Sequence, residues 1–186
     1  MAAARTRTRA RDLPDPNPER LVHTYANLIL RLSYTYLKST QDAEDICQDV
    51  LMKRLKRAEP FENLEHERAW IIRVTSNACK DLLRRADRKL EVVNLDDIPE
   101  PAAPQEHAPS FGPGRPSRVT AAVMSLPVAY REAIYLHYYE GYAIKEIARV
   151  TGKSESAIAQ HLSRGRAKLR ASLGDMMEGD FDEQRN

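Results

Sequence analysis

Hydrophobic residues in the first part of the chain recur with the period of an α-helix. From residue 21, apolar and aromatic positions follow one another at intervals of four, three, four and four residues. These positions are Leu21, Tyr25, Leu28, Leu32 and Tyr36. Such spacing places them on one face of a helix. We expect the helix to begin at Asn17-Pro18-Glu19, because an Asn cap, a first-turn proline and an acidic residue all favour a helix start.

Two further helices are predicted before residue 90. Thr40 is a suitable cap for the first of them, and Pro60 is expected to end it. Its apolar stripe consists of Ala43, Ile46, Cys47, Val50 and Leu51. A third helix is predicted from about Leu64 to Arg88, with apolar and small residues along one side. The segment 17–89 is therefore predicted to form a small helical bundle.

The helical pattern returns at residue 118 with shorter elements. A helix begins near Val119 and stops before Pro127. The next helix ends at Gly141, and its apolar positions are Tyr130, Ile134 and Tyr138. A short helix is predicted over 144–150.

A tight turn and a longer helix complete this second part. The turn is Gly152-Lys153-Ser154, in which the glycine supplies backbone freedom and the serine caps the following helix. The seam of the last helix is Ile158, Leu162, Gly165 and Leu169. A short helix, a glycine turn and a longer basic helix form the layout of a helix-turn-helix.

The segments between and beyond these helices lack any periodic spacing of apolar residues. Residues 90–117 contain six of the eleven prolines and predict a flexible acidic linker. Residues 1–16 are expected to be flexible, and 174–186 form an acidic tail. The predicted fold class is all-α, with an N-terminal helical bundle at 17–89 and a C-terminal helix-turn-helix domain at 118–173.

Composition and charge narrow the range of possible functions. The chain has 186 residues, and it contains no apolar run of the length that a membrane span or a secretory signal requires. Two cysteines exclude a disulfide scaffold and a four-thiolate zinc site, so a cytoplasmic location is expected. Net charges of +3 over 21–89 and +5 over 118–170 contrast with −4 over 90–117 and −4 over 171–186. Two basic blocks favour a polyanionic partner.

The last helix carries the clearest candidate for a DNA-reading surface. The residues opposite its buried seam are Ser156, Gln160, Ser163, Arg164 and Ala167. Small and hydrogen-bonding side chains let a helix approach base edges in the major groove, and the basic residues that follow can neutralise phosphates. The alternative is a solvated basic helix in an ordinary bundle.

Several motifs resemble those of the bacterial sigma-70 family, specifically its extracytoplasmic function (ECF) group. Asp42-Ala43-Glu44-Asp45-Ile46-Cys47-Gln48-Asp49-Val50 is similar to the family's D-A-E-D signature. Ala69-Trp70-Ile71-Ile72-Arg73, with Asn77, Asp81, Arg84 and Arg85, is similar to the next conserved stretch. Leu126-Pro127, Glu146-Ile147-Ala148 and Leu162-Ser163-Arg164-Gly165-Arg166 resemble its second conserved domain.

The resemblance implies an RNA polymerase sigma factor that selects promoters and has no catalysis of its own. Asp45, Gln48 and Asp49 would dock on the β′ clamp helices of core RNA polymerase, and the β flap would be a further contact. An anti-sigma factor is a further expected partner. No cofactor and no metal site are expected, because the five histidines are scattered without a ligand spacing.

The same resemblance assigns two DNA-contacting sets. The residues expected to recognise and melt the −10 element are Phe61, Asn63, Trp70, Arg73, Asn77, Lys80, Arg84 and Arg85. The loop 60–64 is the candidate pocket for a flipped base, while Trp70 is equally explained as a core residue. The residues expected at the −35 element are Ser156, Ala159, Gln160, Ser163, Arg164, Arg166 and Lys168.

Two other functions remain open from the residues alone. A free-standing helix-turn-helix regulator would bind its operator as a dimer, but no effector domain or heptad extension supports it. A metal-dependent enzyme would use the acidic residues 42–49, but these diverge around one helix and form no compact oxygen cage.

Overall fold

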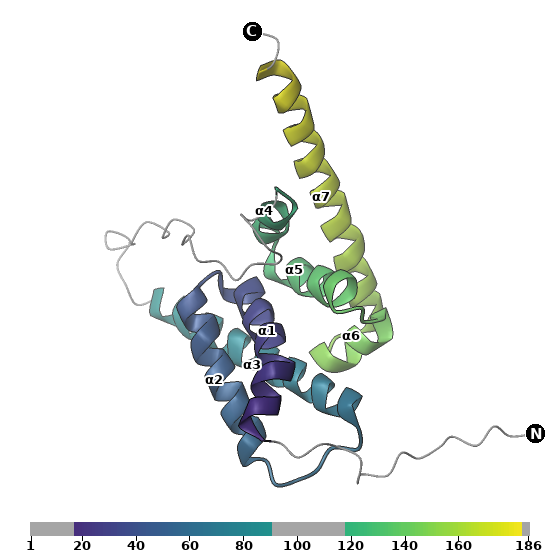
Figure 1. Ribbon diagram of the computed structural model, residues 1–186. Helices are drawn as coiled ribbons and strands as arrows, with labels where there is room; N and C mark the ends of the chain where they lie inside the picture. Colours follow the sequence, from purple (N-terminus) through teal and green to yellow (C-terminus); the bar gives the residue numbers. More distant parts are fainter. Residues whose placement is uncertain (1–16, 91–117, 184–186) are drawn as a thin grey trace, which may run out of the picture.

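Three helices form the N-terminal part of the chain (Figure 1). In the computed structural model, residues 17–90 and 118–183 are described, with side chains up to 86 and 174. Helix α1 spans Pro18–Leu37, and Asn17 caps it by accepting a hydrogen bond from the backbone N–H of Arg20 at 2.7 Å. The predicted start is confirmed. The helix ends at Lys38, whose φ of 56° is left-handed.

The second and third helices differ from expectation at their ends. Helix α2 spans Thr40–Lys56, and Ser39 rather than Thr40 is its cap, with the Ser39 hydroxyl accepting from the Asp42 N–H at 3.2 Å. The prediction that Pro60 ends α2 was wrong, because the backbone is already extended at Arg57. Helix α3 spans Leu64–Leu90, close to the predicted range.

The C-terminal part contains four α-helices and one π-helix. These are α4 (Arg118–Ser125), α5 (Val128–Ile134), the π-helix Tyr135–Tyr139, α6 (Ile144–Thr151) and α7 (Glu155–Glu183). The helix-turn-helix prediction is confirmed in layout: α6 ends at Gly152 with φ of 70°, and α7 follows after Ser154.

The π-helix is a feature that the apolar spacing did not predict. A wider turn after Ile134 shifts the register, so that Tyr135 and Leu136 are buried while Tyr138 is 58% exposed. Tyr138, one of the apolar positions from which this helix was predicted, is therefore not part of the core. Single π-turns often occur at functional positions.

The two parts pack directly against one another. Helix α5 lies on α1, and α6 lies on α3 (Figure 1). All regular structure in the described residues is helical, which confirms the fold class. The segment 1–16, predicted to be flexible, lies outside the described residues. Of the linker predicted at 90–117, Leu90 is the last residue of α3, and 91–117 lie outside the described residues. Helix α7 continues beyond 173 to Glu183. Within the described ranges, no helix has the length and apolar character needed to cross a membrane.

Candidate polymerase and nucleic-acid interfaces

Helix α7 separates a buried seam from an exposed polar face. Ile158, Leu162 and Gly165 are buried, as the spacing predicted. The exposed set is Ser156, Ala159, Gln160, Ser163, Arg164, Arg166 and Lys168. Helical periodicity places Ala159 and Arg166 on one flank of this face and Lys168 on the other. The Arg166 guanidinium lies 3.5 Å from the hydroxyl of Tyr138, so it points towards the π-helix.

A serine cap and a close contact at a glycine hold α7 in place on the rest of the C-terminal part. The Ser154 hydroxyl accepts a hydrogen bond from the Ala157 N–H at 3.2 Å, which caps the helix. At Gly165 a Cβ would lie 3.2 Å from Cγ1 of Ile134, so a glycine allows α7 and α5 to approach closely. The polar face is therefore held outward by a packed and capped helix.

Helix α3 carries a second polar stripe. Trp70, Arg73, Asn77, Lys80 and Arg84 are spaced by three, four, three and four residues, which aligns them on one face. Arg73, Asn77, Arg84 and Arg85 are exposed, while Trp70 and Lys80 are partly buried. Arg84 forms an exposed ion pair with Asp81 at 2.9 Å, a kind of contact that contributes little stability.

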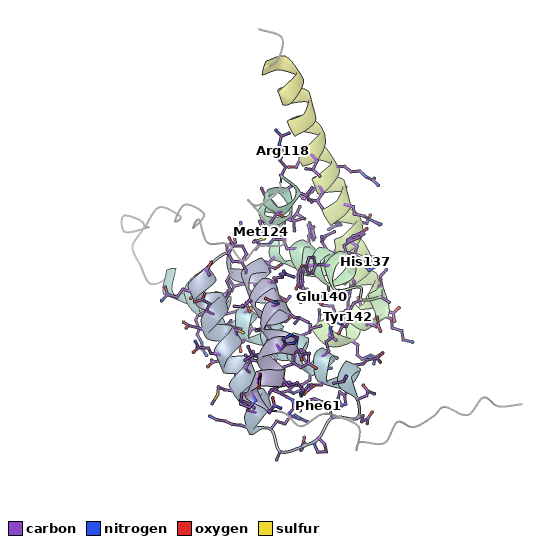
Figure 2. All side chains as sticks on the ribbon, in the orientation of Figure 1. Phe61, Arg118, Met124, His137, Glu140 and Tyr142 are labelled. Atoms are coloured by element: carbon purple, nitrogen blue, oxygen red, sulfur yellow. The ribbon has the colours of Figure 1, made fainter. Side chains whose placement is uncertain are left out.

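The loop between α2 and α3 is organised around Phe61. This side chain is only 1% exposed, and the guanidinium carbons of Arg54 and Arg57 lie 4.8 and 4.9 Å from its ring centroid. The Trp70 ring meets it edge-on at 5.6 Å. Phe61 therefore forms the inner wall of this loop, at the foot of the bundle in Figure 2. Asn63 begins α3, because its side-chain oxygen accepts from the His66 N–H at 2.8 Å.

A buried carboxylate lies behind this loop. Glu67 has no exposed side-chain area, and it accepts hydrogen bonds from Arg20, Arg54 and the hydroxyl of Tyr25. Burial by itself would raise the pKa of Glu67, but these three donors outweigh burial and hold that pKa below its usual value. Since Arg54 also stacks on Phe61, the carboxylate links α1, α2 and the loop.

Helix α2 presents an acidic and polar stripe. Asp45, Gln48 and Asp49 are exposed, as the sequence predicted. Met52, also exposed at 49%, extends the same face at the next helical position. Sequence reasoning missed Met52, although its spacing of seven from Asp45 was the signal. An apolar side chain beside two carboxylates is suited to a protein partner.

Polar contacts connect the N-terminal and C-terminal parts. Glu132 is buried on α5, and its carboxylate contacts Tyr36 and Lys80 from the N-terminal part and Lys153 from the helix-turn-helix turn. Glu140 follows the π-helix and pairs with Arg68 of α3. Figure 2 shows Glu140 and Tyr142 where the two parts meet. No pattern in the sequence indicated these pairs, because their partners are distant along the chain.

Two cavities lie at this junction. An apolar groove of 690 Å³ is formed by the end of α1, α4, the π-helix and α7, and its lining includes Val123, Tyr138 and Leu169. A polar cleft of 520 Å³ separates the start of α3 from α6, with Arg73 and Arg149 on opposite sides. Among the described residues, no group of three His, Cys, Asp or Glu side chains is arranged to hold a metal ion.

Comparisons with known proteins match both helical parts of the chain. The family model described as Sigma-70 region 2 matches residues 21–89, and Sigma-70, region 4, matches 117–169. ECF RNA polymerase sigma factor SigM of Mycobacterium tuberculosis is 29% identical over 161 residues, covering 87% of this chain and 79% of SigM. RNA polymerase sigma factor SigV of Bacillus subtilis is 27% identical, covering 77% and 82%.

Two solved structures share the fold. The sigma factor RpoE in complex with the anti-sigma factor NepR from Bartonella quintana matches with a TM-score of 0.64 and 20% identity, over 84% of this chain and 96% of that one. CnrH in complex with the cytosolic domain of CnrY matches with a TM-score of 0.54 and 25% identity, over 85% and 88%. The two matched regions cover both helical parts of the chain. The chain therefore belongs to the ECF group of the sigma-70 family and is a non-catalytic sigma factor of RNA polymerase.

Proposed function

We propose that this sigma factor reads the −35 element with residues 154–170 and recognises and opens the −10 element with residues 61–88. The observation that carries the first assignment is the exposed face of α7 opposite the buried Ile158, Leu162 and Gly165. Ser163 and Gln160 are short or hydrogen-bonding side chains that suit base edges, and Arg164 suits a base edge or a phosphate. Lys168, at the flank of this face, suits contact with the phosphates of the DNA backbone.

The stripe on α3 supports the −10 assignment. Asn77 offers an amide that both donates and accepts, and Arg73, Lys80, Arg84 and Arg85 supply positive charge along one helix. Promoter opening requires a base to leave its stack, which costs a few kcal/mol. Binding of the flipped base in a protein pocket offsets this cost. The loop 60–64 is the proposed pocket, with Phe61 as its inner wall and Trp70 and Asn63 nearer its rim.

The acidic stripe of α2 is the proposed surface for the β′ clamp helices. Carboxylates of Asp45 and Asp49 can accept charge-assisted hydrogen bonds from basic side chains of a partner helix, while Gln48 adds polar and Met52 apolar contact. The apolar groove at the junction of the two parts is the proposed contact for the β flap, because its lining surface is almost entirely apolar. The proposed location of this activity is the cytoplasm.

An anti-sigma factor is the proposed regulatory partner. The support is that RpoE, which matches this chain in fold, was solved in complex with the anti-sigma factor NepR. Pull-down from the native cell with tagged protein tests this assignment, and recovery of core polymerase subunits alone would contradict it.

The decisive experiment is transcription with core polymerase in the presence and absence of this protein. Genomic DNA fragments serve as templates, and the 5′ ends of the transcripts are mapped. We expect defined start sites that share upstream elements and appear only with the protein. Asn77→Ala should reduce these transcripts, while Lys56→Ala on an exposed position of α2 should not. Start sites that are independent of the protein would overturn the proposal.

A further inference from the structure

One charged segment of the sequence has no part in the proposed function. Between residues 5 and 11, arginine stands at every second position and threonine or alanine stands between, with no acidic residue. We call residues 5–11 the basic arm, and its arginines are Arg5, Arg7, Arg9 and Arg11. Side chains at every second position lie on one side of an extended chain, about 6.6 Å apart. The four charges can therefore face one polyanion together.

The basic arm precedes the end of the N-terminal bundle that carries the loop between α2 and α3 (Figure 1). Asn17, six residues after Arg11, is the cap of α1. In the first turn of α1, Arg20 donates a hydrogen bond to Glu67 at 3.0 Å. Glu67 lies in the first turn of α3, directly after the loop 60–64. Six residues span at most about 20 Å, so the arm is anchored close to the proposed −10 pocket.

This pocket lacks the positive charge that a bound DNA strand requires. Residues 57–66 hold one arginine and three glutamates, a net formal charge of −2. All three glutamates are exposed: Glu59, Glu62 and Glu65. The arginine, Arg57, already pairs with Glu59 at 2.7 Å. The first cation of the α3 stripe is Arg73, more than two helical turns beyond the start of α3. A phosphate strand at the pocket therefore needs cations from elsewhere.

We propose that the basic arm binds phosphates of the DNA strand at the −10 pocket and supplies the positive charge that the loop lacks. Guanidinium groups suit this role, because they form paired, charge-assisted hydrogen bonds with phosphate oxygens. Such contacts carry no base sequence, so the arm strengthens binding while Asn77 and the pocket retain the specificity. The position of the contact rests on the proposed −10 function, whereas the charge of the arm does not.

A salt titration tests the contact in the holoenzyme, reconstituted from core polymerase and the full chain. The probe is a fluorescent DNA fragment that carries one of the promoters mapped in the transcription experiment. In the test variant, alanine replaces all four arginines of the arm. Four lost phosphate contacts should reduce the slope of log K against log salt by about three. From about 50 to about 200 mM salt, the affinity advantage of the wild type should then shrink about 60-fold.

The matched control keeps the charge and changes only the side chain. Lysine at the same four positions should leave the slope within about one unit of the wild-type value, because each ammonium still neutralises one phosphate. Both variants change residues that precede α1, so the helical circular dichroism should equal that of the wild type.

Directed cleavage locates the arm on the promoter. Ala10→Cys keeps all four arginines and carries an iron chelate that cleaves nearby DNA. The native thiols stay unlabelled, because burial raises the pKa of Cys47 to about 11 and that of Cys79 to about 12. We expect cleavage at the −10 element, and cleavage confined to the −35 element, or none, would overturn the location.

The titration separates DNA from a protein partner. Equal slopes for the wild type and the alanine variant would overturn the DNA contact. Weaker recovery of core polymerase by the alanine variant, with an unchanged slope, would also overturn it and assign the arm to the polymerase. Start sites that are independent of this protein would overturn the proposed function instead. A titration on duplex DNA without a promoter still measures the arm in that case, and a reduced slope there would keep its contact with DNA.

Discussion

The substitution Glu67→Gln tests whether the N-terminal bundle depends on its buried carboxylate. In the wild type, Glu67 is the shared acceptor for Arg20, Arg54 and Tyr25, and the Arg20 contacts are 3.0 and 3.1 Å. Arg54 is 5% exposed, so solvent cannot replace the lost carboxylate there. A glutamine keeps the shape but removes the charge, and its NH₂ group faces a guanidinium.

The expected cost follows from the burial of both partners. Breaking a buried ion pair from one side destabilises a protein by about 3–5 kcal/mol, since the remaining charge has no compensation. Glutamine retains one acceptor, so we expect the lower end, about 3 kcal/mol. For a bundle of the size of residues 17–90, that loss of unfolding free energy corresponds to a decrease in Tm of roughly 10–20 °C.

Urea denaturation followed by far-UV circular dichroism measures this free energy of unfolding. Glu62→Gln is the matched control, because Glu62 is exposed in the neighbouring loop and its loss should change stability by less than about 0.5 kcal/mol. A Glu67→Gln variant within about 1 kcal/mol of the wild type would refute the reasoning that a shared buried anion holds these helices together.

The same carboxylate predicts a pH dependence with a definite sign. The pKa of Glu67 is lower in the folded protein than its usual value of about 4.3, so the folded state favours the ionised form. This contribution to stability is present above the usual value and is lost as the pH falls through the lowered pKa. The difference in unfolding free energy between wild type and Glu67→Gln should therefore shrink on acidification, and a constant difference would contradict it.

The remaining predictions concern the proposed interfaces and the packing of α7. Arg164→Ala should weaken promoter binding by the polymerase holoenzyme and reduce the salt dependence of log K by about one unit, and an unchanged slope in a salt titration would argue against a DNA face. Asp49→Arg should abolish recovery of β′ in a pull-down while the helical circular dichroism stays intact, and undiminished recovery would remove α2 as the docking surface. Gly165→Leu should lower stability by about 1–3 kcal/mol in thermal denaturation, since even a Cβ added at this position would lie 3.2 Å from Cγ1 of Ile134, whereas a neutral result would show that α5 and α7 can separate without cost.

Local features of the chain were predicted well from the sequence because their causes lie within a few residues. The cap at Asn17, the turn at Gly152 and the seam from Ile158 to Leu169 each depend on neighbours in the same helix or turn. The exposed face of α7 followed from the same periodicity. The burial of Phe61 could not be predicted in this way, since it depends on Arg54 and Arg57 packing over its ring.

By itself the sequence determined the helices, their outward faces and the family, because periodicity and short motifs are written in neighbouring positions. Only the tertiary structure decided what covers those faces. Tyr36 and Glu132 are 96 positions apart, and nothing local in either residue indicates the other. The π-helix sets the register that buries Tyr135 and brings Glu140 to Arg68. Such contacts arise from the packing of whole helices, and this packing places a carboxylate against the lysine of the α3 stripe.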